Sequence, residues 1–522
     1  MMVAVPVLLL ALGVLRPNTE VWSRLWHTRL PAQLVNTVVL LAGSAIGAVL
    51  LGVALAWVVS AYRFPGSRVI SGALVLPLAM PGYILGFLTL STFGRTGPIQ
   101  DQWAAWFGRE TWFVPVESIG GAIVTFTLVL YPYVYLLARA ALRDQAAGAY
   151  HAARVLGASP NEAARRVVLP LLRPAVAAGA AVVMMETLTD FATVQYFGVD
   201  TVTVGVFRIW RGTYDRDAAS ELATVVLGFA LLAIGLERIA RRRARFGESG
   251  GSAGGIEPVA LRGRGAWLAT ILTALPVGMA FVGPATRLGV WALKEQTSDR
   301  GTPLLEQYPS YLWHSVVLVA VTTMVVMAVA MVLANAMRFG QPKLTRAAAR
   351  IAVFGYAVPG PVVAMGVLLA VVGVDDVLER VGANLPGVAG AGSLAVLFYA
   401  YAVRFLAPGL GASEAGIEAV SDAVTASART LGASPRRTMA AIHLPLARTS
   451  LLAGAILVGV DTLKELPIVL LLRPFGFDTL PVWVYDLASE SRFGQAALPA
   501  LSIVAVAVVP VLLLSRQLER SA

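Results

Sequence analysis

The chain alternates long apolar runs with short polar segments, and the apolar runs have the length of membrane-spanning helices. A helix needs about 20 mostly apolar residues to cross a lipid bilayer. Eight uncharged runs reach that length, bounded by Arg29 and Arg63, Arg68 and Arg95, Glu117 and Arg139, Arg264 and Arg287, Glu306 and Arg338, Arg350 and Asp375, Arg380 and Arg404, and Arg492 and Arg516. This pattern alone predicts eight clear spans.

Four weaker runs complete the prediction. They are the N-terminal run to Leu15 and the segments 173–195, 221–237 and 448–471. The N-terminal run has the length of a signal-peptide core, but it lacks the charged start and the small-residue cleavage site of one. We read it as a short first span. The expected fold class is therefore an all-α integral membrane protein with about 12 transmembrane helices.

Composition supports this class and excludes several functions. Of 522 residues, 57% are hydrophobic and 14% are charged, whereas soluble proteins carry about 25% charged residues. Cysteine is absent, which excludes disulfides, thiolate metal sites and a cysteine nucleophile. The histidines are scattered without the spacing of a metal site: His27, His151, His314 and His443. A redox enzyme or a transition-metal catalyst is not expected.

The formal net charge of +11 raises the question of a nucleic-acid partner. In membrane proteins, however, an excess of lysine and arginine belongs on the cytoplasmic loops. When the loops are alternated from a cytoplasmic N-terminus, Lys and Arg gather on the inner side, and Asp and Glu gather on the outer side. We therefore expect a cell-membrane location (the inner membrane of a Gram-negative cell), both termini in the cytoplasm, and no nucleic-acid partner.

The two halves of the chain repeat each other. The segment at 156–160 returns at 431–435, an offset of 275 residues that other segments share. The further matches are Leu169-Pro170 with Leu444-Pro445, Glu186 with Asp461, Asp190 with Glu465, and, at neighbouring offsets, Pro81-Gly82 with Pro359-Gly360 and Asp200-Thr201 with Asp478-Thr479. An Arg-rich and Gly/Ser-rich linker separates the copies. We predict six-helix units at 1–240 and 265–522, joined by a cytoplasmic linker at 241–264, in one orientation and with pseudo-two-fold symmetry.

The longest cytoplasmic loop of each half has its motif residues at the same spacing in both copies. Its turn residues predict a helix–turn–helix. Alanine-rich residues up to Leu156 favour a short helix. Gly157 can adopt the left-handed conformation that ends it. Ser159 can cap a second helix that has Pro160 at its first position. We expect Leu169-Pro170 to end this second helix at the membrane surface.

This spacing, present twice and placed before a span, resembles the EAA loop of binding-protein-dependent ABC importer permeases. The resemblance implies that the first helix of each loop docks in a cleft of an ATPase subunit and transmits its motion. The residues that carry it are Ala152, Ala153, Gly157, Leu169, Pro170, Ala428, Gly432, Leu444 and Pro445. The glutamate that opens the family pattern is His151 in the first copy and Ala426 in the second, so any ion pair made by that glutamate is lost or replaced.

The chain has no G-x-x-x-x-G-K-[ST] phosphate-binding loop. We therefore expect no cofactor in this chain and no catalysis by it. The resemblance implies that ATP and Mg are bound by two copies of a separate ATPase subunit, and that a periplasmic or lipid-anchored substrate-binding protein docks outside.

The fifth span of each half carries acids: Glu186 and Asp190, and then Asp461 and Glu465. An i, i+4 spacing places each pair on one helix face. Ionisable residues in a span face a cavity or a partner, so the acids are candidates for a polar translocation path. The structural alternative is that Lys464 neutralises Asp461 and Glu465.

Carboxylates suit a hard cation and repel anions such as sulfate. The segments around these acids, Asp461 to Pro467 with Leu472 to Leu480 and Glu186 to Phe191 with Tyr196 to Val199, resemble fused ferric-iron permeases. The resemblance covers nearly the whole chain and implies import of ferric iron by alternating access. Thiamine and polyamine permeases are the nearest alternatives in pattern. A proton- or sodium-driven secondary transporter that uses the membrane carboxylates is an alternative of another class.

Overall fold

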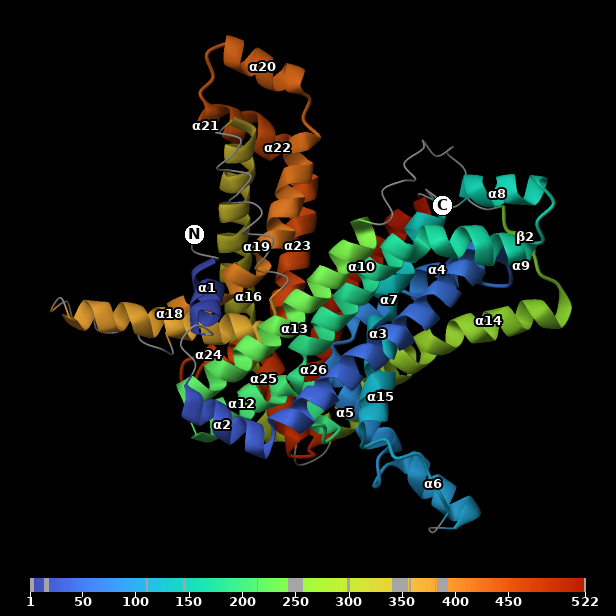
Figure 1. Cartoon of the computed structure of the whole chain (residues 1–522), viewed down its shortest axis with the longest axis horizontal. Helices are drawn as coiled ribbons and strands as arrows, with labels where there is room; N and C mark the ends of the chain where they lie inside the picture. Colours follow the sequence, from blue (N-terminus) through green and yellow to red (C-terminus); the bar gives the residue numbers. More distant parts are fainter. Residues whose placement is uncertain are drawn as a thin grey trace. The chain divides into compact units, whose positions relative to one another are not determined.

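The computed structural model (Figure 1) describes residues 4–13, 18–108, 111–143, 147–213, 215–242, 257–297, 301–339, 355, 358–380, 382 and 393–520. Within these residues the secondary structure is helical, apart from two strands of two residues each. Most of the predicted linker, residues 243–256, lies outside the described residues.

The first half of the chain forms one strand and a succession of helices. In chain order they are α1 (Ala4–Gly13), α2 (Thr19–Thr28), α3 (Leu30–Ala61), β1 (Tyr62–Arg63), α4 (Ser67–Ala73), η1 (Leu76–Ala79), α5 (Gly82–Phe93), α6 (Pro98–Phe107), α7 (Ile119–Ala141), α8 (Ala147–Val155), α9 (Pro160–Ala163), η3 (Ala164–Val168), α10 (Leu169–Thr189), α11 (Phe191–Tyr196), α12 (Val202–Thr213) and α13 (Arg216–Arg242).

The second half begins with a strand that pairs in parallel with β1 and continues as helices. In chain order they are β2 (Val259–Ala260), α14 (Gly263–Val277), η5 (Gly278–Val282), α15 (Gly283–Gln296), α16 (Gly301–Phe339), α18 (Gly360–Arg380), α19 (Leu394–Glu418), α20 (Asp422–Thr430), α21 (Pro435–Thr438), η6 (Met439–His443), α22 (Leu444–Leu446), α23 (Arg448–Lys464), α24 (Pro467–Leu472), α25 (Leu480–Ser489) and α26 (Phe493–Arg520).

The helices confirm an all-α membrane protein. Among the described residues, nine helices are long and apolar enough to cross a bilayer, and two bent helix pairs raise that number to eleven. One pair bends by 94° between Ala79 and Gly82, and the other bends by 78° between Leu446 and Arg448. The predicted N-terminal span forms α1, which has 10 residues and is too short to cross a bilayer alone.

One predicted span lies at a different place along the chain. The sequence bounded it by Arg380 and Arg404, whereas α19 runs from Leu394 to Glu418 and contains Arg404 in its interior. The Arg404 side chain is buried and forms an ion pair with a carboxylate, which explains how a charged residue is accommodated inside the span.

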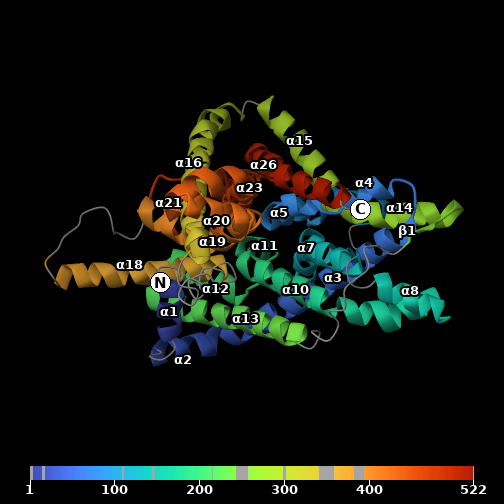
Figure 2. The same ribbon diagram turned by 90° about the horizontal axis from the view of Figure 1, so that it is seen from above.

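The described helices group into two compact units, and unit 2 is built on α3, α7 and α10. Unit 2 comprises Trp26–Val204, Gly228–Thr297 and Leu487–Ala522. Its three central helices pack side by side (Figures 1 and 2). Glycines allow the close approach: a Cβ on Gly52 would lie 2.9 Å from the carbonyl oxygen of Tyr131, and one on Gly179 would lie 2.9 Å from Cα of Val134. Small residues at crossings are typical of membrane helix packing.

Unit 1 repeats this arrangement with α16, α19 and α23. It comprises Met1–Leu25, Gly205–Leu227 and Ser298–Asp486. Its three central helices also pack against one another, and part of their contact is a buried apolar cluster that includes Met331, Leu406 and Leu410. Since α3, α7 and α10 occupy the corresponding places in the repeat, the same three-helix core is built twice.

Each unit contains segments from both halves of the sequence. In unit 1, α1 packs along α18, where Gly366 leaves room for the backbone oxygen of Pro6. In unit 2, α15 packs along α26, and α26 contacts η1 and α5. The units defined by contacts therefore differ from the halves defined by the repeat, whose boundaries at 240 and 265 remain a prediction.

The repeat also extends to individual hydrogen bonds. In unit 2, the Asn36 side chain donates to the backbone oxygen of Asp200 (2.9 Å), and the Thr37 hydroxyl accepts from the amide of Val202 (3.1 Å). In unit 1, His314 Nδ1 lies 2.9 Å from the backbone oxygen of Asp478, and the Ser315 hydroxyl accepts from the amide of Leu480 (2.8 Å). In each half, the second span is thus hydrogen-bonded to the equivalent loop.

Candidate functional site

The first repeated loop folds as its turn residues predict. Helix α8 ends before Gly157, whose φ of 93° is in the left-handed region. The Ser159 hydroxyl accepts a hydrogen bond from the amide of Glu162 (3.3 Å), and α9 begins at Pro160. A Cβ on Gly157 would meet no atom within 4 Å among the described residues, so glycine is required there by backbone conformation and not by space.

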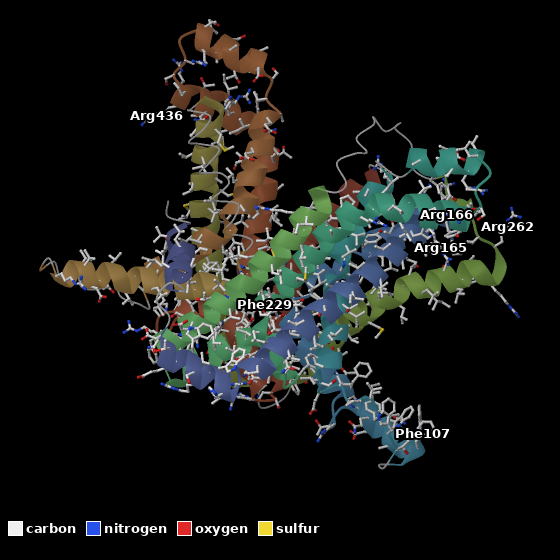
Figure 3. The ribbon with its side chains drawn as sticks, viewed as in Figure 1. Phe107, Arg165, Arg166, Phe229, Arg262 and Arg436 are labelled. Atoms are coloured by element: carbon white, nitrogen blue, oxygen red, sulfur yellow. The ribbon has the colours of Figure 1, made fainter. Side chains whose placement is uncertain are left out.

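The second loop has the same construction. Helix α20 ends before Gly432, whose φ is 80°. The Ser434 hydroxyl accepts from the amide of Arg437 (3.3 Å), and Pro435 is the first residue of α21. The loops carry basic side chains, with Arg165 and Arg166 in the first and Arg436 in the second (Figure 3). The helix–turn–helix prediction is therefore confirmed in both copies.

The prediction that Leu169-Pro170 ends the second helix of the loop is wrong. In the first copy, α9 continues through the π-helical turn η3 into α10, and the amide of Leu169 bonds to the oxygen of Ala164. In the second copy, the amide of Leu444 bonds to the oxygen of Met439 in the same way. Because Pro170 and Pro445 have no N–H and crowd the preceding turn, one wider turn lets the helix continue. In the second copy it then ends at Leu446.

Both loops present apolar side chains on their surfaces. Leu156 and Leu431, which directly precede the two turn glycines, are 88% and 87% exposed. His151 and Ala426, which replace the glutamate of the family pattern, lie on α8 and α20, and Ala426 is exposed. Both copies therefore expose a leucine at the same position of the turn.

An arginine that the sequence analysis missed holds the second loop. Arg338, at the end of α16, has a side chain that is 14% exposed. It donates to the backbone oxygens of Ile417 and Val420, the latter at 2.8 Å, and to the carboxylate of Asp422 at 2.9 Å. It also donates to the hydroxyl of Thr425 (3.0 Å). Arg338 therefore fixes the start of α20 to the end of a membrane-spanning helix.

In the first half, Asp190 is the C-cap residue of α10, one residue past the helix, and it caps the next helix. Helix α10 ends at Thr189, and Asp190 has φ −86° and ψ 83°. Its carboxylate accepts hydrogen bonds from the amide of Thr193 (2.9 Å) and from the Thr193 hydroxyl (2.5 Å). Asp190 thereby caps α11. Asp190 is thus the residue that ends α10, and its amide still bonds to the backbone oxygen of Glu186 (3.1 Å).

In the second half, Glu465 occupies the equivalent position but has a different partner. Helix α23 ends at Lys464, and Glu465 is extended. Its Oε1 accepts from the amide of Ile468 (3.4 Å), and its Oε2 lies 3.5 Å from Nε of Arg404. Lys464 pairs with Asp461 (3.3 Å). The structural alternative is therefore half right, because Lys464 neutralises Asp461 while Arg404 pairs with Glu465.

The repeated Pro-Gly motif explains where these two acids point. A Cβ on Gly82 would lie 2.2 Å from Oδ2 of Asp190, and a Cβ on Gly360 would lie 2.5 Å from Oε1 of Glu465. Gly82 and Gly360 are the first residues of α5 and α18. Each carboxylate therefore lies against the N-terminus of the third span of its own half, where the helix dipole favours a negative charge.

Among the described residues, no group of three or more His, Asp or Glu side chains lies close enough to hold a metal ion. The four acids named from the sequence are distributed as two local pairs, Glu186 with Asp190 at the end of α10 and Asp461 with Glu465 at the end of α23.

Comparison with known proteins identifies the family. The family model described as "Binding-protein-dependent transport system inner membrane component" matches the chain twice, at residues 48–244 and 326–522. The chain belongs to this family. It is a permease with two copies of the family domain and is a multi-pass membrane protein.

Individual relatives agree with this assignment. The permease is 23% identical to an Fe(3+)-transport system permease protein of Haemophilus influenzae over 520 residues, which is 99% of this chain and 96% of the relative. It is 29% identical to a sulfate transport system permease protein of Salmonella typhimurium, over 46% of this chain and 88% of the relative. A molybdenum transport system permease protein of Escherichia coli is 27% identical over 37% of this chain and 87% of the relative.

Proposed function

We propose that this permease is the membrane subunit of an ATP-driven importer that moves ferric iron from a substrate-binding protein into the cytoplasm by alternating access. The observation that carries the proposal is the match along 99% of the chain to a permease named for Fe(3+) transport. Relatives named for sulfate and molybdenum cover less than half of the chain. The carboxylates near the ends of α10 and α23 also favour a hard cation over an anion.

ATP hydrolysis is assigned to separate subunits, and this chain catalyses no step. Two ATPase copies, which hold ATP and Mg, dock on α8 and α20. The support is that each helix is followed directly by an exposed leucine and then by a left-handed glycine, at equivalent positions in the two copies. When ATP closes the ATPase pair, the two helices move together and the spans open outward. Hydrolysis reverses the movement.

The four acids have two kinds of role in this proposal. Asp190 and Glu465 lock the junction between the third and fifth spans of each half, since each lies against a helix N-terminus. Glu186 and Asp461 lie one turn earlier on their helices, and we assign them to contact iron in transit, Asp461 in exchange for its ion pair with Lys464. Carboxylate oxygens are suitable ligands for a hard cation passing between binding sites.

The proposed orientation places both termini and both repeated loops in the cytoplasm. Arg165, Arg166 and Arg436 on these loops follow the positive-inside rule. The substrate-binding protein then docks on the opposite face, and the location is the inner membrane if the cell is Gram-negative.

Uptake by cells that carry or lack this chain tests the substrate. Under iron limitation, radiolabelled ferric iron, thiamine, putrescine and sulfate are supplied separately. We expect loss of iron uptake alone in cells without the chain. Loss of thiamine, putrescine or sulfate uptake with normal iron uptake would overturn the substrate and leave the importer assignment intact.

A second arm tests the energy source. Iron uptake is measured in cells whose partner ATPase carries an inactivating substitution in its phosphate-binding loop, and in cells treated with a protonophore at constant ATP. We expect the ATPase substitution to abolish uptake. Uptake that survives the substitution but fails with the protonophore would favour the ion-coupled secondary transporter.

A further inference from the structure

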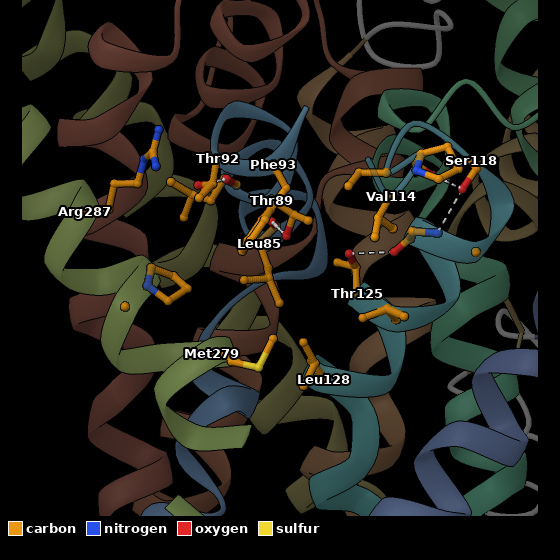
Figure 4. A pocket seen from close by; sticks show the side chains of 18 of the residues that line it. Leu85, Thr89, Thr92, Phe93, Val114, Ser118, Thr125, Leu128, Met279 and Arg287 are labelled. Carbon is orange, nitrogen blue, oxygen red and sulfur yellow. Dashed lines mark hydrogen bonds between the residues drawn. The ribbon is translucent and has the colours of Figure 1, made fainter. Parts of the chain in front are cut away.

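Unit 2 contains a cavity of about 720 Å³ between the third and fourth spans of the first half and the first span of the second half (Figure 4). Its walls are α5, residues 114–118, the start of α7, η5 and the start of α15. Small-molecule sites commonly have volumes of about 300–1,000 Å³, so the cavity is large enough for a ligand. Its lining contains no residue of the repeated loops and neither Glu186 nor Asp190.

The walls of the cavity are apolar because their hydroxyl groups are used elsewhere. Thr89 and Thr92 donate to backbone oxygens of their own helix, at 2.8 Å and 2.6 Å. Thr125 donates to the oxygen of Gly121 (3.0 Å). The remaining lining is mainly aliphatic and includes Leu128 and Met279, which lie toward one end of the cavity in Figure 4. Such a wall offers no oxygen cage for a metal cation.

Arg287 is the charged residue in this lining. Its Nη2 donates to the backbone oxygen of Ser91 (2.9 Å), and its guanidinium lies over the ring of Trp291, 4.4 Å from the centroid. Its Nε is buried and has no hydrogen-bond partner within the described residues. No carboxylate of the described chain lies within ion-pair distance of it. Since arginine stays protonated, this charge favours an external anion.

The wall beside Arg287 departs from regular helix geometry. The π-helical turn η5, Gly278–Val282, comes directly before Gly283 and Pro284. Because Pro284 has no N–H for the preceding turn, a wider turn is formed. Gly278 and Gly283 carry no side chains, so the wall on this side is backbone and leaves room for a flexible chain. π-helical turns are frequent at functional sites.

We propose that this cavity binds one anionic phospholipid, with an acyl chain in the apolar part and the phosphate against Arg287. The bilayer supplies this amphiphile at high local concentration, and a guanidinium group matches the geometry of a phosphate. The nearby acid Glu117 pairs with Arg95 (3.9 Å), which leaves the positive charge of Arg287 available to the headgroup. The iron cargo is excluded by like charge.

Native mass spectrometry of the purified complex tests the proposal. The complex with its ATPase subunits is stripped of lipid and titrated with dioleoyl phosphatidylglycerol or dioleoyl phosphatidylcholine. We expect one tightly held phosphatidylglycerol per permease, bound about fivefold more tightly than phosphatidylcholine because one arginine contacts the anionic headgroup. Equal retention of the two lipids by the native complex would overturn the proposal.

Three variants locate the site. Arg287→Gln should remove the preference for phosphatidylglycerol, and Arg287→Lys should keep most of it. Leu128→Trp, which fills the cavity, should weaken both lipids. Arg264→Gln is the matched control, because Arg264 is an exposed arginine at the other end of the same span. A loss of preference in Arg264→Gln equal to that in Arg287→Gln, or an unchanged preference in Arg287→Gln, would contradict the assignment.

Discussion

At the scale of single residues, the two halves hold an equivalent acid in place with different side chains. Asp190 and Glu465 are equivalent in the repeat, and each lies against the first residue of the third span, Gly82 or Gly360. Asp190 is held by the Thr193 hydroxyl, whereas Glu465 is held by Arg404. The sequence shows the acids and the glycines as separate repeated motifs. Their contact was not predictable, because it joins residues more than 100 positions apart.

The first prediction concerns the glycine that faces Glu465. Gly360→Ala should destabilise the permease by about 1–3 kcal/mol, because the new methyl group would lie 2.5 Å from Oε1 of Glu465 and overpack the junction. Thermal unfolding in detergent measures the loss. The control is Gly373→Ala in the same helix, where a Cβ meets no atom within 4 Å among the described residues. Equal melting temperatures for the two variants would refute this contact.

The second prediction concerns the buried ion pair. Arg404→Met should destabilise the permease by about 3–5 kcal/mol, because Glu465 would remain buried without its cation. The double variant Arg404→Met, Glu465→Gln should recover much of the loss, since the amide oxygen can still accept from Ile468. The two single variants and the double variant form a double-mutant cycle read by thermal unfolding. Additive losses would mean that the pair contributes no coupling energy.

At the scale of elements, local chemistry predicted the repeated loops well. The left-handed glycines and the serine caps were read correctly because each depends on residues within one turn. The π-helical turns before Leu169 and Leu444 were missed, since a proline was interpreted as a helix end where a wider turn was formed. Arg338 was also missed, because nothing near it in sequence indicates that it meets a loop about 80 residues later.

The third prediction tests how α20 is attached. Arg338→Gln should leave the permease in the membrane but reduce iron uptake and the stimulation of ATPase activity by the binding protein by about tenfold. The reason is that α20 and the residues directly before it lose three charge-assisted hydrogen bonds. Arg436→Gln, an exposed arginine on the neighbouring α21, is the matched control and should be near normal. Similar losses in both variants would indicate a general effect of loop charge.

At the scale of the whole molecule, hydrophobic length and the internal repeat predicted the all-α membrane class and the presence of two copies of one domain. They did not predict which helices pack together. Unit 1 includes α1 from the opposite half of the sequence, and unit 2 includes α26. Apolar faces in a membrane do not reveal their partners, because lipid and neighbouring helices are equally apolar. The glycines that permit close approach, such as Gly366 beside Pro6, can be recognised only from the structure.

The last prediction asks whether the two loops act as a pair. Gly157→Val and Gly432→Val each force a β-branched residue into a left-handed conformation at a cost of about 1–3 kcal/mol, which should displace α8 or α20 without unfolding the spans. If both loops must move together, either single variant should abolish iron uptake nearly as fully as the double variant. Independent loops would instead give half-uptake in each single variant. Gly157→Asn and Gly432→Asn are the controls, because asparagine tolerates this conformation, and they should retain uptake. Loss of uptake in the asparagine variants would show that the surface of the turn, and not its backbone conformation, is what the ATPase subunit requires.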